Sequence, residues 1–325
     1  MTRYKIILLF LGISLCTFSQ AQVIDNTSSI KNNESDKYFR FHYDNDYFTA
    51  TDAYYTQGIT LELVHPVLKY NPLNKLLFKP KQSDAKYGIR FDHYGYTPTS
   101  ISSDFIRYGD RPFSGNLSFS SFLIAVDTAK RARLSTTLTV GVIGSKAGGK
   151  EMQVKIHEWL ENIIPRGWEY QIANDLILDY QINYEKALYQ YRNVFVVNSY
   201  SELRVGTHTD KIKSGFNFMV GSIPNPYASN VQAQGTKKKF RYYVYGQLQP
   251  GFTIYDATLQ GGVFNKTSPY TISAKDLTRL TLQGDFGAVM KIRKLTLEYC
   301  QSFITKEFKT GQLHRWGGVR LGFVF

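Results

Sequence analysis

Gln153 and His157 form the first pair of side chains whose types and spacing suggest chemistry. Apolar residues recur every three or four positions from 150 to 163, a spacing that predicts a short helix, and Pro165 would end it. Residues four apart share one face of a helix, so both side chains could point into the same cleft. A neutral histidine can act as a general base, but a purely structural histidine would look the same in the sequence.

A second polar group lies far upstream, between two segments of alternating character. Asn45 and Asp46 are followed by Asp52 and Thr56. Carboxylate, amide and hydroxyl oxygens are the ligands that calcium prefers, and the same residue types also favour a simple Asx-rich turn. Both interpretations stay open from the residues alone. Because adjacent residues of a strand face opposite ways, Asn45 and Asp46 could share one site only if the strand ends or bulges there.

The segments that must position these residues have the pattern of membrane-spanning strands. Leu321, Phe323 and Phe325 share one face of the last segment, with Arg320 and Gly322 on the other. The same alternation recurs in residues 39–44, 59–63, 176–181, 243–246, 252–255 and 295–300. At about 25 residues per strand and turn, the chain predicts an all-β fold, a transmembrane antiparallel barrel of about twelve strands. The short helix at about 150–163 would then lie near the site, in a loop or against the wall.

The N-terminus predicts export. Arg3 and Lys5 precede an apolar run that ends at Cys16 and is about half as long as the ~20 residues that a spanning helix needs. Small and polar residues follow, so we expect residues 1–21 to be a cleaved signal peptide and residues 22–325 to be one outer-membrane β-barrel enzyme domain. A lipoprotein signal at Cys16 is the alternative.

The composition indicates the chemical class of the partner. The formal net charge is +13, and 24 Tyr and 22 Phe supply the aromatic residues that membrane interfaces favour. Such an excess of positive charge suggests an anionic partner. An exported barrel does not normally meet nucleic acid, so we expect phosphorylated lipid and no nucleic acid. Neither a Gly-x-Ser-x-Gly elbow nor a His-Glu-x-x-His zinc motif occurs in the sequence.

A set of short motifs, taken in order along the chain, resembles the outer-membrane lipid A 3′-O-deacylase family. The motifs are Asn45-Asp46, Asp52 with Tyr55-Thr56-x-Gly58, Gly109-Asp110-Arg111-x-Phe113-Ser114, Gly141-Val142-Ile143-Gly144, Ala147-Gly148-Gly149 with Glu151, Gln153 and His157, Trp168 with Gln171 and Asn174, Thr258-Leu259-Gln260-Gly261, and Glu307-Phe308-x-Thr310-Gly311. The resemblance implies a twelve-stranded barrel that hydrolyses an acyl ester of lipid A in the outer leaflet and depends on calcium.

The resemblance also implies roles for individual residues. His157 would be the general base, Gln153, Asn45 and Thr56 would complete the catalytic site, and Asp46 with Asn45 would hold Ca²⁺. The expected protein is a monomer of the bacterial outer membrane that meets lipid A or lipopolysaccharide and the surrounding outer-membrane lipids.

Two departures from the family pattern concern the same site. The family has an active-site lysine in the loop after a Tyr-x-Pro motif, whereas the loop after Pro98 here has no lysine, which leaves Arg107 or Arg111 as substitutes. The family also has an acidic residue about six positions after the histidine, where this chain has Ile163, with Glu161 close by.

Two other classes of protein share the barrel pattern. An outer-membrane phospholipase A would need a paired serine and histidine. A passive porin-like barrel would need no active site, and its helix would be only a plug. If His157 is not the base, His42, just upstream of Asn45, is the first alternative.

Overall fold

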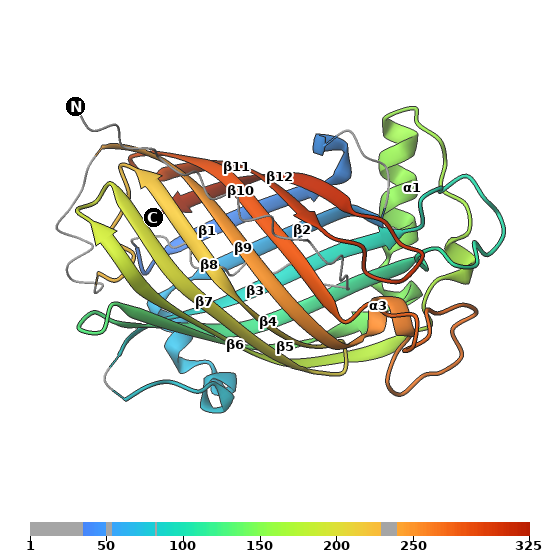
Figure 1. The fold of residues 1–325 in the computed structure, drawn as a ribbon, viewed down its shortest axis with the longest axis horizontal. Helices are drawn as coiled ribbons and strands as arrows, with labels where there is room; N and C mark the ends of the chain where they lie inside the picture. Colours follow the sequence, from blue (N-terminus) through green and yellow to red (C-terminus); the bar gives the residue numbers. More distant parts are fainter. Residues whose placement is uncertain (1–34, 50–53, 82, 229–238) are drawn as a thin grey trace, which may run out of the picture.

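The computed structural model describes residues 35–49, 54–81, 83–228 and 239–325. The predicted signal peptide and Asp52 lie outside the described residues. Twelve antiparallel strands in the described residues form a closed barrel, in which β1 pairs with both β2 and β12 (Figure 1). The strands are β1 (Tyr38–Asn45), β2 (Tyr54–Val64), β3 (Asp84–Thr97), β4 (Ser114–Asp127), β5 (Ala132–Ile143), β6 (Asp175–Tyr191), β7 (Phe195–Gly206), β8 (Thr209–Gly221), β9 (Phe240–Asp256), β10 (Leu280–Ile292), β11 (Leu295–Ile304) and β12 (His314–Val324). The predicted fold class is confirmed.

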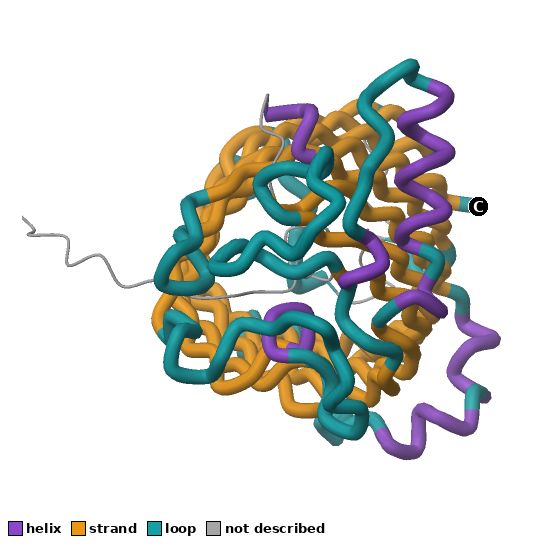
Figure 2. Tube along the Cα trace, turned by 90° about the vertical axis from the view of Figure 1, so that its right-hand side faces the viewer, coloured by secondary structure: helices purple, strands orange, loops and turns teal. Residues whose placement is uncertain are grey.

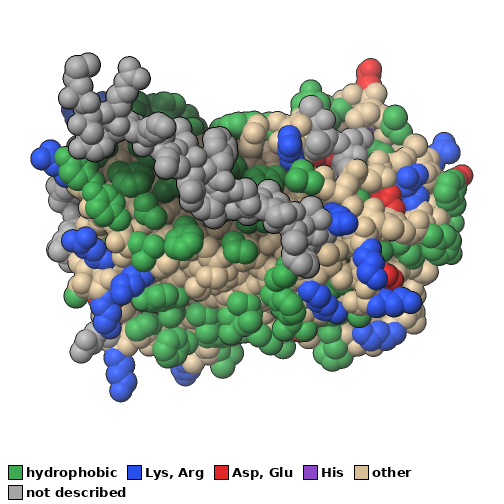
Figure 3. Space-filling model, viewed as in Figure 1, with side chains coloured by type: hydrophobic (Ala, Val, Ile, Leu, Met, Phe, Trp, Pro, Cys, Tyr) green, Lys and Arg blue, Asp and Glu red, His purple; other side chains and the backbone are tan. Residues whose placement is uncertain are grey.

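Alternation along each strand separates an apolar outer face from a polar interior. Phe119, Leu178, Phe216 and Leu321 are among the exposed outward residues. Figure 3 shows such hydrophobic side chains over the middle of the barrel, with lysine and arginine side chains gathered towards both ends. An apolar band between charged ends is the surface that a membrane-spanning barrel presents to lipid.

The interior of the barrel is filled by buried charged residues in ion pairs. These pairs are Arg40 with Glu62, Arg90 with Asp92, Arg204 with Asp179, Lys211 with Glu202, and Arg320 with Glu298. Buried charges need partners, because an unpaired ion in a dry interior is strongly unfavourable. The lumen is therefore a packed polar core.

The two ends of the barrel differ in the lengths of their connections. At one end the segments 98–113, 144–174, 257–279 and 305–313 link the strands (Figure 1). The other end, where Phe325 also lies, has the short turns 128–131, 192–194 and 293–294 together with two longer connections, 65–83 and 222–239. Outer-membrane barrels have short periplasmic turns and longer extracellular loops. The long-loop end is therefore the outer surface of the cell.

The long loops carry the helices. They are η2 (Asp46–Thr49), η5 (Ser145–Ala147), α1 (Gly149–Trp159), η6 (Trp168–Tyr170) and the single turn α3 (Ala257–Gln260). At the opposite end, η3 (Pro66–Tyr70) and η4 (Pro72–Leu76) lie between β2 and β3. No helix in the described part of the chain is both long and apolar enough to cross a bilayer.

The predicted helix exists, but the prediction of its C-terminal end was wrong. Helix α1 ends at Trp159, four residues before Ile163. Glu161 has a φ of 52°, which cannot continue a right-handed helix, and the amide of Asn162 turns back to the carbonyl of His157 at 2.9 Å. The helical spacing of apolar residues continues past this break as far as Ile163, so the sequence pattern predicted too long a helix.

Candidate active site

Thr56 lies at an irregularity at the outer end of β2. The pairing of β2 with β3 shifts register between Tyr55 and Gln57, so Thr56 is the extra residue of a β-bulge. Tyr55 points into the barrel, where it packs with Tyr96 and Trp316. A bulge changes the direction of the side chain at the extra residue. Thr56 therefore lies on the outer face, where a Cβ on Gly95 would be 3.5 Å from its methyl group.

Helix α1 packs on the outside of the wall, near the outer ends of β3 and β4. A Cβ on Gly149 would lie 3.0 Å from the Cα of Gly115 and 2.9 Å from the ring of Trp168, so only glycine allows this approach. His93, on the outer face of β3, pairs with the carbonyl of Ala147 just before the helix at 2.8 Å. Figure 2 shows α1 along the edge of the ring of strands and not across its middle. The helix is thus no plug of the lumen.

Gln153 joins the helix to the wall. Its Nε2 donates to Thr56 Oγ1 at 2.8 Å, and its Oε1 accepts from the indole Nε1 of Trp168 at 2.7 Å. Because an indole N–H can only donate, Oε1 must face Trp168 and Nε2 must face Thr56. The Thr56 hydroxyl accepts this bond and keeps its own proton for another acceptor. All three side chains are buried.

His157 lies one helical turn beyond Gln153 and is half-buried. Its Nδ1 lies 2.6 Å from the carbonyl oxygen of Ile163. A carbonyl can only accept, so Nδ1 carries a proton, and in the neutral form of the ring the lone pair is on Nε2. Ile163 is the position where the family resemblance implied an acidic residue, and its main chain here provides the acceptor. The carbonyl of Ile163 thus fixes the orientation of the imidazole ring, and no carboxylate is needed for this.

Asn45 and Asp46 lie where β1 ends and η2 begins. Asn45 is paired with Gln57 of β2 in the register, close along the strand to Thr56. Its Oδ1 accepts from the amide of Tyr47 at 2.7 Å, which is the predicted Asx turn. Asp46 is buried. The strand end that a shared Asn45–Asp46 site requires is therefore present.

The two arginines near the loop after Pro98 have different environments. Arg111 is 1% exposed, forms an ion pair with Glu307 and lies 3.8 Å over the ring of Tyr96. Arg107 is partly exposed and its Nε donates to Asp110 at 3.1 Å. Arg107 also lines an outer basin of about 400 Å³. Of the two, only Arg107 is accessible to a phosphate.

Tyr270 braces the loop that carries Arg107. Its hydroxyl accepts from the amide of Gly109 at 2.8 Å and donates to the carbonyl of Asp110 at 3.0 Å. Burial raises the pKa of Tyr270, so its hydroxyl stays protonated near neutral pH.

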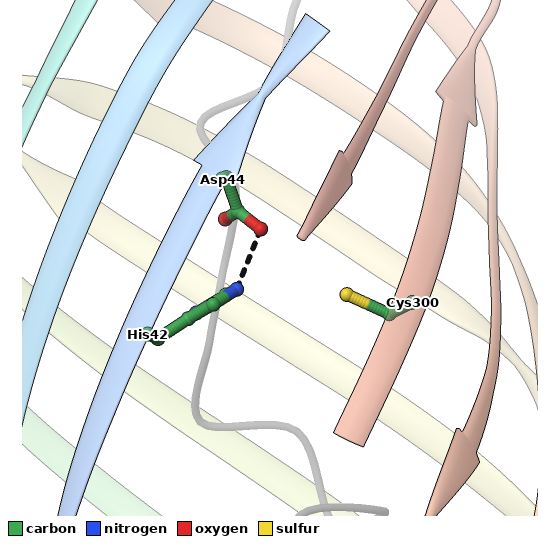
Figure 4. A group of neighbouring side chains, drawn as sticks. All are labelled: His42, Asp44 and Cys300. Carbon is green, nitrogen blue, oxygen red and sulfur yellow. Dashed lines mark hydrogen bonds and ion pairs between the residues drawn. The ribbon is translucent and has the colours of Figure 1, made fainter. Parts of the chain in front are cut away.

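His42, the first alternative base, lies on the other side of the wall. Its Nε2 is 2.5 Å from Asp44 Oδ1, and both side chains are buried in the lumen with Cys300 (Figure 4). The ligand atoms of His42, Asp44 and Cys300 lie within 4.8 Å of one another. One carboxylate, one imidazole and one thiol suit a softer metal than calcium. Within the described residues, this trio therefore lies on the inner face of the barrel wall and the Thr56–Gln153 pair on its outer face.

The other histidines have structural surroundings. His65 accepts from the amide of Val67 at the start of η3, and His208 pairs with Asn116 in the lumen at 2.9 Å. His314 is buried near Glu307. Together with His93 under the helix, this leaves His157 as the histidine next to the Thr56–Gln153 pair.

Comparison with known proteins decides the family. The model of the family "Outer membrane protein LpxR" matches residues 6–325. The chain belongs to the LpxR family. LpxR proteins are known as lipid A deacylases, which supports a role for this protein in modifying lipid A of the outer membrane. The outer-membrane localisation is confirmed.

A solved structure of an LpxR protein has the same fold. LpxR from Salmonella typhimurium has a TM-score of 0.72 at 19% sequence identity, and the match covers 89% of this chain and 100% of that chain. The β domain of the Bordetella autotransporter BrkA has a TM-score of 0.46 at 9% identity, covering 90% of this chain and 100% of that chain. No curated protein matches the chain.

Sequence reasoning missed the role of Trp168 in this LpxR-family site. Trp168 was part of the motif set, but nothing in its spacing linked it to Gln153. The available signal was Gly167, whose φ of 83° lets the chain turn so that the indole passes under the helix.

Proposed function

We propose that this protein hydrolyses an ester-linked acyl chain of lipid A in the outer leaflet, with the 3′-O-linked acyl or acyloxyacyl group as the expected target. One observation carries the proposal. Gln153 fastens helix α1 to Thr56 on the outer face of the wall, and this places the free Nε2 of His157 outside the barrel at its extracellular end. A substrate embedded in the membrane can reach this side of the wall without entering the lumen.

The tip of α1 suits contact with such a substrate. Trp159, Leu160 and Ile163 are exposed, with Trp159 82% exposed, although apolar residues at helical spacing usually face a core. Lys150 and Lys155 on the same helix are also exposed. Apolar side chains beside ammonium groups match acyl chains beside phosphates.

His157 acts as the general base in this proposal. Nε2 takes a proton from water, the water oxygen attacks the ester carbonyl carbon, and the same proton then passes to the departing sugar oxygen. The products are a free fatty acid and a hydroxyl on the sugar. Thr56, whose hydroxyl proton is not used by Gln153, can donate to the carbonyl oxygen as its negative charge develops. No covalent acyl-enzyme and no nucleophilic serine are required.

Gln153 acts through its neighbours. Its two amide bonds are already made, one to Thr56 and one to Trp168, so it fixes the helix relative to the wall. Positioning of this kind matters because displacement of a base by about 1 Å can cost ~100-fold in rate.

The oxygen donors at the end of β1 fit calcium. A buried carboxylate from Asp46, the amide oxygen of Asn45 and the carbonyls of η2 are hard ligands of the type that Ca²⁺ takes. When bound there, Ca²⁺ would polarise the ester carbonyl and stabilise the oxyanion. Because Asn45, Thr56 and His157 all come from one chain, the site needs no partner subunit, and we expect a monomer.

The barrel gives little support to a passive pore or a serine phospholipase. Its lumen is filled with ion pairs where an open channel would hold water. His93 and His157 pair with the carbonyls of Ala147 and Ile163, and His208 pairs with Asn116 and with the hydroxyl of Thr209. None of these partners is a serine hydroxyl.

The direct test is hydrolysis by the purified protein in detergent with calcium. We expect release of fatty acid from lipid A and none from phosphatidylethanolamine. Release from phospholipid instead would indicate a phospholipase, and conductance across a planar bilayer without release from either lipid would indicate a pore.

A further inference from the structure

The connection between β2 and β3 folds back over the outside of the barrel. Helices η3 and η4 begin at the short-turn end, yet Asn71 Nδ2 donates to Ser121 Oγ of β4 at 3.1 Å. Thr136 of β5 donates to the carbonyl of Phe78 at 3.1 Å, and the hydroxyl of Tyr180 on β6 accepts from the amide of Phe78 at 2.8 Å. Both views show the two turns outside the ring of strands (Figures 1 and 2).

These bonds involve the lipid-facing side of the wall. Ser121 lies two positions from Leu123 on β4 and Thr136 two positions from Leu138 on β5, so each shares the outward face with that leucine. Leu77 of the connection packs against both leucines. A polar side chain on the lipid side needs a partner within the protein. Residues 66–79, which we call the connection segment, thus extend the membrane-facing surface of β4–β6.

The outward side of the connection segment is an apolar ridge. Val67, Tyr70, Leu73 and Leu76 are 58%, 75%, 41% and 61% exposed. Val67 and Tyr70 are three apart in η3, and Leu73 and Leu76 are three apart in η4. Residues three apart eclipse each other in a 3₁₀-helix, so each pair lies on one side of its helix. Phe78 continues the ridge at 57% exposure.

Lysines flank this ridge. Lys69, Lys75, Lys79 and Lys81 are all exposed, and no acidic residue occurs between Glu62 and Asp84. The ammonium group of Lys69 lies 4.7 Å over the ring of Tyr70. An apolar ridge with an aromatic residue and a one-signed row of cations is the composition of an interfacial membrane anchor.

We propose that the connection segment binds the glycerophospholipids of the periplasmic leaflet. The ridge from Val67 to Leu76 inserts among the upper acyl chains, and the lysines contact the phosphates. Continuity with the lipid-facing wall and the positive charge together favour lipid as the occupant over water or a protein. This anchor is independent of the deacylase proposal and concerns the opposite end of the barrel.

Fluorescence quenching tests the anchor. The Tyr70→Trp protein is reconstituted in phospholipid vesicles, and the emission of the unsubstituted protein, which carries Trp159, Trp168 and Trp316, is subtracted. A matched control is Lys130→Trp, in the short turn after β4 at the same end, where the lysine side chain is 74% exposed. We expect phospholipid brominated near the top of its acyl chains to quench Tyr70→Trp at least about threefold more than Lys130→Trp.

Other outcomes overturn the proposal. Equal quenching of the two variants by brominated lipid, or stronger quenching of Tyr70→Trp by aqueous iodide, would place the ridge in water. Lipid quenching that disappears as the protein-to-lipid ratio rises would show that a second copy covers the ridge.

The lysines have a separate test with the same probe. In the Tyr70→Trp protein, the change from phosphatidylcholine to phosphatidylglycerol vesicles should increase lipid quenching. Lys69→Gln with Lys75→Gln should abolish this increase while quenching in phosphatidylcholine persists. An undiminished increase would remove the lysines from the proposal.

Discussion

His42 lies on the inside of this barrel and His157 on its outside, and their surroundings differ. His42 has the more conventional catalytic surroundings, with Asp44 at 2.5 Å and a cysteine beside it, but it is sealed in a lumen of ion pairs. His157 has a main-chain carbonyl as its hydrogen-bond partner, and it lies half-exposed on the outside of the barrel. Under the proposed function the substrate lies in the bilayer, so the accessible histidine is the better candidate for the general base.

The largest expected effect separates these two histidines. General-base catalysis is typically worth ~10²–10⁴-fold, so His157→Asn should lower kcat by that factor at every calcium concentration. His42→Asn should keep activity within about threefold but lower the thermal unfolding temperature, since it disturbs a buried pair. The measurement is fatty-acid release from lipid A by both folded variants. Full activity in His157→Asn would place the base elsewhere.

Metal dependence should follow the carboxylate at the end of β1. Chelation should abolish activity and added calcium should restore it. Asp46→Asn removes the one charged ligand in the proposed set, so the calcium concentration for half-maximal activity should rise about tenfold or more. A calcium titration of wild type and variant checks this, with Asp44→Asn in the lumen as the control. Superimposable curves for Asp46→Asn and wild type would exclude Asp46 as a ligand.

Substitution of Gln153, which positions helix α1, should have a smaller effect on kcat. Gln153→Glu keeps the shape and can still accept from Trp168, but an ionised carboxylate can only accept. Thr56 would then donate its hydroxyl proton to the introduced carboxylate and lose its hydrogen bond to the ester carbonyl. Loss of a buried hydrogen bond costs about 1–3 kcal/mol, so we expect kcat to fall about 10–100-fold while KM changes little. Trp168→Phe, which removes only the other bond, should have a weaker effect. If Gln153→Glu changed KM alone, Gln153 would contact substrate instead of positioning the helix.

The two arginines give a comparison of stability with binding. Arg111→Met would remove the guanidinium from its ion pair with buried Glu307, and breaking a buried ion pair costs about 3–5 kcal/mol of unfolding free energy. Arg107→Met should leave stability nearly unchanged and raise KM for phosphorylated lipid A a few-fold, with less effect on dephosphorylated lipid A. Denaturant unfolding and steady-state kinetics make the two measurements. An unchanged KM ratio in Arg107→Met would argue against phosphate contact.

The smallest effect concerns the partner of His157. Ile163→Glu would put a carboxylate on the residue whose main-chain carbonyl contacts the imidazole, and a carboxylate within reach of the ring would stabilise its protonated form. Because only the neutral form can accept a proton, the acid limb of the activity profile should move to higher pH, by up to about one unit. Ile163→Gln is the uncharged control. An unmoved limb in the Glu variant would mean that the side chain at 163 does not reach His157.

The fold could be predicted from the sequence because period-two alternation reports directly which residues face lipid. The contact between Thr56 and Gln153 could not, since the residues are 97 positions apart and the bulge that aims Thr56 outward carries no sequence signal. The face of helix α1 was also misleading. Its apolar residues suggested a packed stripe, whereas the buried residues are Gly149 and Gln153.

The hydrogen-bond partner of His157 could not be predicted from the sequence, for a different reason. The acceptor is the main-chain carbonyl of Ile163, and a carbonyl is present at every residue whatever its type. Its position depends on the left-handed turn at Glu161, which the helical spacing did not reveal.

Mass spectrometry of lipid A from cells expressing wild type, His157→Asn or His42→Asn tests the central claim most directly, namely that the chemistry takes place on the outer face of the wall. With equal amounts of folded protein in the outer membrane and calcium present, we predict loss of an acyl group with wild type and with His42→Asn, and intact lipid A with His157→Asn. Deacylated lipid A with His157→Asn and intact lipid A with His42→Asn would contradict the account and move the active site into the lumen.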